Sequence, residues 1–447
     1  MSWQKNALRD VLRLAGCLFL SSSVCGCSGA ASWKQNMEYG DEALSANNYC
    51  EARQYYCRAV DEAARGGKAS QRLGRSLTAL ARAYMEEGRY AASEPVFRKA
   101  LTAYRQSLGD RHLTVASALS ALAACYFEEG KYVEAEPVCK EALDIQLCSL
   151  GADNLHVAST LTNLAGIYQR QGKDEEAEDC FSRALKIYDR QKDPDPPAIV
   201  PALNKLAMFY ASQDRFEEAR KSARRALALQ EKRLPAFDLS LARTIKTLAA
   251  IEKAQFNYDE SEKYYKQAIA ILERGNGADR EFLCDILDDY ADLLFIQRKY
   301  DEAEPLYKQA ISACEAARGP DHPCVAERLS DLAWLYKNTD RLQEAQPLLC
   351  RALSIQESSL ESDSPLLFKT LNKLSDIYVD DGKFDQAEQL YQKSLPTLTS
   401  VLGENHPHVA DVLENWAMVA LKANDTVKAG QLQERARSIR KKVANEK

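Results

Sequence analysis

The sequence predicts an all-α solenoid of stacked helix pairs, and two kinds of observation support this prediction. Large aliphatic residues recur at a constant step of 42 from Leu77 to Leu413, and small residues recur at the same step after Ala81 and after Ala100. Only 19 Gly and 14 Pro occur among 447 residues, whereas good helix formers are abundant. Repeats of this length are typical of arrays in which each unit buries its apolar face against its neighbours.

The N-terminal segment has the composition of an export signal. Lys5, Arg9 and Arg13 form a basic opening, which the apolar stretch Leu14–Cys25 follows. At about a dozen residues this stretch is too short to span a bilayer as a helix, but it has the length of a secretory signal core. Residues 1–27 are therefore predicted to be a leader outside the fold.

The end of this leader resembles a bacterial lipobox. Val24, Gly26 and Cys27 match its apolar, small and cysteine positions, while Cys25 stands where Ala, Ser or Thr is usual. The resemblance implies lipidation of Cys27 and an exported chain anchored in the bacterial cell envelope, at the outer membrane or in the periplasm. The alternatives are ordinary cleavage near residues 28–30, which would release a secreted chain, and a cytoplasmic chain without export.

Each 42-residue unit is predicted to contain two helices. In the first helix, Leu77, Leu80, Ala81 and Tyr84 have the i, i+3, i+4, i+7 spacing of one apolar stripe. Glycine is expected in the turn between the helices, at Gly88, Gly130, Gly172 and Gly382. Proline is expected in the first turn of the second helix, where a missing N–H costs little, at Pro95, Pro137, Pro305 and Pro347.

The register of the repeat predicts the domain boundaries. Nine repeats begin near residue 70, and Tyr49, Ala52 and Ala59 show the pattern once more in a degenerate unit before them. We expect a leader at 1–27, a tether at 28–35, a solenoid at 36–440 whose degenerate repeat covers 36–66, and a basic tail at 441–447.

The repeat unit resembles the tetratricopeptide repeat, in the 42-residue form of kinesin light chains and related bacterial proteins. The stretches Leu161–Tyr168 and Gly382–Glu388 and the loop Leu402–Pro407 show this resemblance, which covers nearly the whole chain after the leader. It implies a right-handed superhelix of about ten helix–turn–helix units with a concave groove lined by the first helices. It also implies that the chain binds protein partners.

Three residues in repeats five and six depart from the repeat pattern, and the proline-rich loop 193–197 between repeats three and four is unusually stiff. Phe256 and Arg298 stand at the turn-glycine position, and Glu252 stands at the position of Tyr84. They predict a change in superhelical curvature in this part of the array; the alternative is drift that the array tolerates.

The sequence contains no recognisable catalytic or cofactor-binding motif. The five histidines recur at two positions of the inter-repeat loop, which indicates a structural role rather than metal binding. Phosphate-binding glycine loops and nucleophile elbows are missing from the sequence, so we expect no enzyme and no cofactor. A net charge of −6 without a clustered basic face argues against nucleic acid as a partner.

The cysteines are predicted to be mostly small buried apolar residues. There are 13 of them, ten beyond the leader, and no CxxC pair occurs. Most stand where other repeats carry Ala, Val, Leu, Ile or Phe. Neither a disulfide framework nor a zinc site is therefore expected.

Polar residues on the first helices are the candidate binding residues. The resemblance implies that positions one, two and five after the Leu77-type residue point into the groove, and that Asn at the first two contacts a peptide backbone. These two positions hold Asn163, Asn204, Lys205, Asn372, Lys373 and Asn415. A carboxamide donates and accepts at once, which suits an extended peptide. The alternative is a solvated face without a ligand.

Four aspartates share one face of a first helix. Asp285, Asp288, Asp289 and Asp292 are spaced i, i+3, i+4, i+7, and like charges at this spacing destabilise a helix. The preceding repeat offers cations on the same side, namely Arg243, Lys246 and Lys253. The interpretations are an inter-repeat ion-pair network, a pocket for a basic peptide, or a divalent cation site.

Taken together, these patterns predict an envelope-associated interaction scaffold that binds an extended peptide or a partner helix in its groove. The acidic face suggests a partner with a basic segment. Two alternatives stay open: a structural or assembly factor that acts through the convex face or by end-to-end stacking, and, more remotely, an enzyme without a recognisable motif.

The leader hypothesis predicts the chemical form of the mature N-terminus. Mass spectrometry of the protein purified from its native cell should find Cys27 as the first residue, carrying acyl groups. An unmodified N-terminus at Ser28 or Ala31 would contradict lipidation, and an intact Met1 would contradict export.

Overall fold

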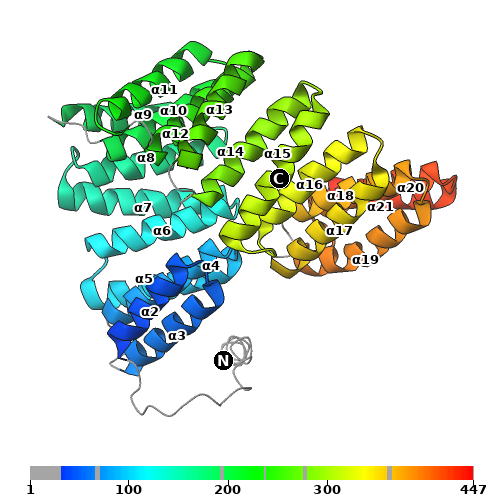
Figure 1. The fold of residues 1–447 in the computed structure, drawn as a ribbon. Coiled ribbons are helices and arrows are strands. Elements are labelled where there is room, and N and C mark those ends of the chain that lie inside the picture. The colour runs from blue at the N-terminus through cyan, green and yellow to red at the C-terminus, as the bar shows by residue number, and fades with distance from the viewer. Residues whose placement is uncertain are drawn as a thin grey trace, which may run out of the picture.

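The computed structural model describes residues 32–65, 71–191, 196–235, 238–274, 279–359 and 365–445. Over these ranges the chain forms twenty helices and no strand. Successive helices pack as pairs, and the pairs stack into a right-handed superhelical solenoid (Figure 1). The predicted fold class is confirmed. The leader, with Cys27, lies outside the described residues.

Ten helix pairs make up this part of the chain. Their first helices are α2 (Trp33–Ser45), α4 (Gln71–Glu86), α6 (Leu113–Glu128), α8 (Leu155–Arg170), α10 (Pro196–Ser212), α12 (Leu239–Ala254), α14 (Arg280–Ile296), α16 (Pro323–Asn338), α18 (Pro365–Asp380) and α20 (Pro407–Lys422). Their second helices are α3 (Tyr49–Arg65), α5 (Tyr90–Leu108), α7 (Tyr132–Leu150), α9 (Asp174–Arg190), α11 (Phe216–Glu231), α13 (Tyr258–Arg274), α15 (Tyr300–Arg318), α17 (Leu342–Ser359), α19 (Phe384–Leu402) and α21 (Thr426–Asn445). The first helix thus begins inside the predicted tether, and the last continues past residue 440. No helix of the described ranges is long and apolar enough to cross a membrane.

The repeated residues form the core of the solenoid. Every member of the series that start at Leu77, Ala81 and Ala100 is buried. The small side chains let the two helices of a pair approach each other, and buried hydroxyls then link their backbones. Ser93 Oγ donates to the Ala81 carbonyl at 2.7 Å, and Ser261 Oγ donates to the Ala249 carbonyl at 2.8 Å.

The turn inside each pair has a left-handed residue. The four predicted turn glycines have φ between +71° and +81°. Phe256 and Arg298 adopt the same conformation, with φ of +63° and +62°, although side chains with a Cβ disfavour it. Their repeats therefore keep the turn geometry of the others. Phe256 remains 76% exposed.

Glu252 is buried where other repeats place tyrosine. Arg220 Nε donates to its Oε1 at 2.9 Å, and Asn257 Nδ2 donates to its Oε2 at 2.9 Å. Burial alone would raise the pKa of Glu252, but these hydrogen bonds hold the pKa below its usual value. The carboxylate thus stays ionised as part of an inter-repeat ion pair.

Three histidines cap first helices. In His112, His322 and His406, Nδ1 accepts from the backbone N–H two residues ahead, at the N-termini of α6, α16 and α20. Asn154 and Asp238 do the same for α8 and α12. These three histidines therefore serve helix capping, which satisfies otherwise unpaired N–H groups.

Proline was predicted in the first turn of each second helix, and this prediction was wrong. Pro95 lies inside α5, which begins at Tyr90, so proline occupies the second turn rather than the first. Pro137, Pro305 and Pro347 lie equally inside α7, α15 and α17. The tight turn starts each second helix earlier than the sequence pattern suggests. Because Pro95 is exposed, water can satisfy the carbonyl that its missing N–H leaves free.

The prediction for cysteine was wrong in part. Cys314 and Cys324 form a disulfide between the end of α15 and the start of α16. Among the other described cysteines, four are buried as predicted and four are exposed, namely Cys50, Cys57, Cys148 and Cys350. The two cysteines are ten residues apart, which is not a spacing typical of disulfide or metal-binding motifs. They come together only because the turn between α15 and α16 brings the two helices side by side.

Two helical glycines allow a test of this packing. A Cβ on Gly74 would lie 2.6 Å from the ring of Tyr104, whereas a Cβ on Gly430 would meet nothing within 4 Å. We expect Gly74→Ala to destabilise the protein by about 1–3 kcal/mol through overpacking. Gly430→Ala should instead stabilise it by up to about 1 kcal/mol, because alanine favours a helix. Thermal unfolding measures both, and a raised melting temperature for Gly74→Ala would contradict the packing argument.

Candidate peptide-binding groove

A cavity of about 960 Å³ opens on the concave face, where the first helices α6, α8, α10 and α12 lie side by side. Eight of its twenty lining residues stand one, two or five positions after the repeated aliphatic residue. These residues are Ser120, Ala124, Asn163, Gly166, Asn204, Lys205, Met208 and Thr247. The predicted residues Asn163, Asn204 and Lys205 therefore meet in one place.

The polar side chains of this cavity are only partly paired. Lys205 Nζ donates to Asn163 Oδ1 at 3.1 Å, and Asn204 Nδ2 donates to Thr244 Oγ1 at 3.0 Å. Asn204 Oδ1 and Ser120 Oγ are enclosed, and neither has a hydrogen-bond partner within the described part of the chain. Enclosed polar atoms of this kind are costly unless something pairs with them.

Charged residues at the ends of the first helices complete the cavity. Glu128 and Arg170 both line it, nine residues after Leu119 and Leu161. Burial raises the pKa of Glu128 and lowers the pKa of Lys205. Glu128 and Arg170 were not among the predicted residues, although both stand at one position of the 42-residue repeat.

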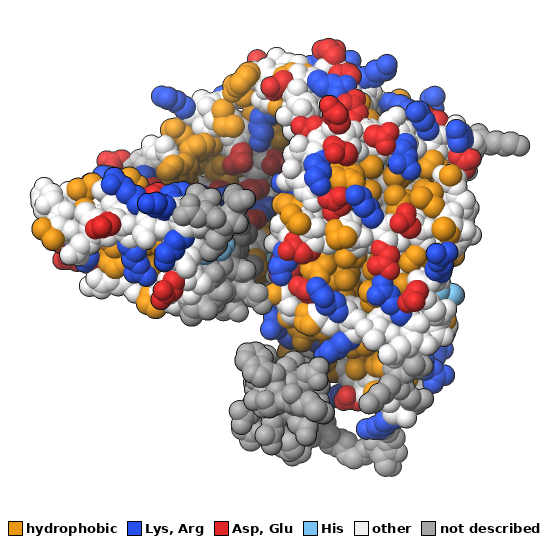
Figure 2. Space-filling view, turned by 180° about the vertical axis from the view of Figure 1, so that it is seen from behind, with side chains coloured by type: hydrophobic (Ala, Val, Ile, Leu, Met, Phe, Trp, Pro, Cys, Tyr) orange, Lys and Arg blue, Asp and Glu red, His pale blue; other side chains and the backbone are white. Residues whose placement is uncertain are grey.

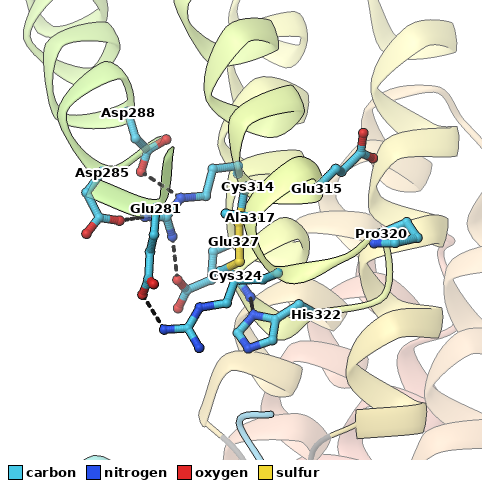
Figure 3. The surroundings of a disulfide bond; sticks show 12 residues. Glu281, Asp285, Asp288, Cys314, Glu315, Ala317, Pro320, His322, Cys324 and Glu327 are labelled. Carbon is cyan, nitrogen blue, oxygen red and sulfur yellow. Dashed lines mark hydrogen bonds and ion pairs between the residues drawn. A yellow bond between two sulfur atoms is a disulfide. The ribbon is translucent and has the colours of Figure 1, made fainter. Parts of the chain in front are cut away.

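The acidic face of α14 is partly neutralised by neighbouring helices. Lys246 Nζ lies 2.9 Å from Asp289 Oδ2, as an inter-repeat ion-pair network requires. Arg328 of α16, which the sequence analysis missed, lies 2.8 Å from Asp285 Oδ1 and 3.5 Å from Asp288 Oδ2 (Figure 3). Asp292 has a neutral partner, since Tyr307 Oη donates to its Oδ1 at 2.6 Å. Arg243, which was expected to face these aspartates, pairs with Asp279 instead.

Arg328 is shared among several carboxylates, and it offsets the effect of their burial only in part. It also pairs with Glu327, at 2.8 Å. Burial, together with the neighbouring aspartates, raises the pKa of Asp288 to about 8. Burial also raises the pKa values of Asp285, Asp292 and Glu327. The face therefore remains a place where negative charge is poorly compensated.

The remaining predicted residues lie further along the solenoid. Lys373 pairs with Asp331 at 3.2 Å and lines a second cavity of about 240 Å³ together with Asp288. Asn372 accepts from Tyr391 Oη at 3.2 Å, and Asn415 of α20 lines neither cavity. Figure 2 shows a recess, with charged side chains inside it, between the C-terminal helices and the rest of the molecule. The predicted residues thus do not form one continuous site.

The raised pKa of Asp288 predicts a pH dependence of stability. A carboxyl group whose folded pKa is raised stabilises the fold fully below its unfolded pKa of about 3.9, and this contribution is lost as the pH rises through 8. Asp288→Asn should therefore gain about 1 kcal/mol or more over the wild type between pH 6 and pH 9. Urea unfolding at both pH values measures this. Asp376→Asn is the control, since that side chain is 59% exposed, and equal pH profiles for all three proteins would refute the assignment.

The repeats of this chain match a known protein family. The sequence profile of the tetratricopeptide repeat matches residues 72–147, 114–190, 198–274, 282–358 and 366–442. No curated protein sequence matches the chain.

Solved structures with similar folds share little sequence with this chain. A signal transduction ATPase with a tetratricopeptide repeat sensor from Pyrococcus horikoshii is 14% identical over 81% of this chain and 54% of its own, with a TM-score of 0.50. A kinesin-light-chain-type protein of Podosopora anserina with nearly identical TPR-like repeats is 20% identical over 56% of this chain and 98% of its own (TM-score 0.34). A Rap protein complexed with Competence and Sporulation Factor is 15% identical over 94% and 100% (TM-score 0.48). These likenesses concern the fold, and the profile match over most of the chain identifies the protein as a member of the tetratricopeptide-repeat family.

Proposed function

We propose that the protein is an interaction scaffold that binds an extended segment of a partner protein in the groove of α6, α8, α10 and α12. The observation that carries this proposal is the cavity of about 960 Å³ with its enclosed, unpaired Asn204 Oδ1 and Ser120 Oγ. An extended peptide presents alternating N–H and C=O groups. Once the side chains of Asn204 and Ser120 turn these enclosed atoms toward the cavity, the peptide can donate to Asn204 Oδ1 and either donate to or accept from Ser120 Oγ.

The shape of the cavity supports a side-chain pocket within this groove. Gly166 lies in the interior of α8, where glycine costs about 1 kcal/mol relative to alanine. A Cβ at this position would meet only Phe127, at 3.9 Å, so packing within the described chain does not require glycine here. The open space over Gly166, beside Phe127 and Met208, would accept an apolar side chain of the partner.

The acidic face of α14 supports a basic residue in the same partner segment. Several of its carboxyl groups have raised pKa values although Arg328 and Lys246 lie beside them. A basic side chain of the partner beside these carboxyl groups would lower their pKa values and so favour their ionised form. The resulting ion pairs would contribute to binding. We propose in addition that the protein lies in the cell envelope with a lipid on Cys27, because residues 1–27 resemble a lipoprotein leader.

Photo-crosslinking distinguishes groove binding from the convex-face alternative. A benzophenone amino acid is introduced at Met208, which is 44% exposed in the cavity, or at Val133, which is 75% exposed on the second helix α7. In the native cell we expect one partner segment, mapped by mass spectrometry, to crosslink to position 208 only. Crosslinks confined to position 133 would favour an assembly factor that acts through its convex face.

The mapped segment, synthesised as a peptide, then tests the predicted contacts. Replacing both Asn163 and Asn204 with alanine should weaken its binding by about 10-fold or more, since each lost hydrogen bond is worth about 1 kcal/mol. Asn415→Ala is the matched control, because Asn415 holds the same repeat position as Asn163 but lies outside both cavities. Isothermal titration calorimetry measures the affinities. Equal affinity for all three proteins would exclude this groove as the binding site.

A further inference from the structure

Two segments that are far apart in the sequence meet at one side of the solenoid. The end of α15 lies against the start of α3 and the end of α4 (Figure 1). Arg318 Nη1 lies 3.1 Å from Tyr49 Oη, 2.8 Å from the Glu86 carbonyl and 3.0 Å from Glu86 Oε2. These partners are 269 and 232 residues away from Arg318 in the chain.

Two further contacts support this meeting point. Asn47 Nδ2 donates to the Ala317 carbonyl at 2.5 Å. The turn at Gly88 packs against the start of α16, because a Cβ there would lie 3.2 Å from Pro323 Cγ. Glycine at this turn is therefore favoured by close approach as well as by its φ of +76°.

The end of α15, which carries Arg318, is also fixed by contacts with its neighbours in the chain, α14 and α16. Glu281 of α14 accepts from Arg318 Nη2 at 2.5 Å, which orients the guanidinium group. The disulfide between Cys314 and Cys324 ties the last turn of α15 to the first turn of α16, so the short loop between them has little freedom (Figure 3). The side chain of Arg318 is only 15% exposed, and an arginine this buried needs its partners.

The meeting point is polar, whereas the rest of the solenoid is held by apolar packing. The buried apolar clusters follow the chain from one helix pair to the next, and none of those in the described ranges includes residues from both sides of this contact. A small polar contact can open while the helix pairs keep their cores.

We propose that the contacts of Ala317 with Asn47 and of Arg318 with Tyr49 and Glu86 form a latch that holds one superhelical turn, from α3 to α15, closed. The helices that line the large cavity, α6 to α12, all lie within this turn. Opening the latch therefore lets the turn widen and changes access to the groove. The latch itself does not depend on what the groove binds.

Small-angle X-ray scattering on the full-length protein tests the latch. The double variant Asn47→Gly/Glu86→Gln removes partners across the contact and leaves Arg318 in place. Glycine is used because position 47 has a φ of +58°, which alanine disfavours. Glu281→Gln is the matched control, because it removes a carboxylate partner of the same arginine on the near side only. We expect a larger radius of gyration for the double variant and faster hydrogen exchange in α3, α4 and the α15–α16 loop. The control should match the wild type in radius of gyration, and circular dichroism should show equal helix content in all three.

Two results would overturn the proposal. In the first, the double variant scatters and exchanges like the wild type. In the second, both variants expand equally, so that Arg318 acts by stabilising the α14–α15 pair rather than across the turn. Because neither readout needs a ligand, a failed peptide-binding experiment leaves this test intact, and failure of the latch leaves the groove proposal to be judged on its own.

Discussion

Close packing of small residues between paired helices is the constraint on which the rest of this structure depends. The Ala81 and Ala100 series stay small through nearly every repeat, and the aliphatic series from Leu77 fills the space between pairs. No single pair can bury its stripe alone, so stability comes from the interfaces between neighbours. Hydroxyls such as Ser93 Oγ add backbone contacts where the helices are closest.

This packing also decides which positions are free for function. Once the aliphatic residue of each first helix points into the core, the residues two and five places later lie on the opposite side of the helix. The residue one place later is more enclosed, and it is buried at Thr162 and Ser330. The identities of the residues two and five places later then vary without cost to the core. The large cavity arises where consecutive repeats place Ala124, Gly166 and Met208 at one of these positions, and the polar atoms of Asn163 and Asn204 lie beside that space.

Several ion pairs link neighbouring repeats. Arg328, Lys246 and Arg220 each pair with a carboxylate of a neighbouring first or second helix, so charge links adjacent units. Around Arg328, burial raises the pKa of Asp288, neighbouring aspartates add to the rise, and the single arginine offsets it only in part. The stability of such a region depends on pH more strongly than that of a fully paired network.

The sequence by itself determined the local features of this protein. The helix pairs and the left-handed turns at Gly88 and its equivalents follow from periods of 3.6 and 42 residues, which depend only on neighbours in the chain. The inward position of Asn163, Asn204 and Lys205 was implied by the resemblance to the tetratricopeptide repeat. The tertiary structure alone decided the disulfide between Cys314 and Cys324, the pairing of Arg328 with the aspartates of α14 and the contact of Arg318 with Glu86. The first of these depends on the fold of one inter-helix turn, and the second on the approach of two adjacent pairs. The third depends on the sum of many small rotations between successive pairs, and no local pattern records that sum.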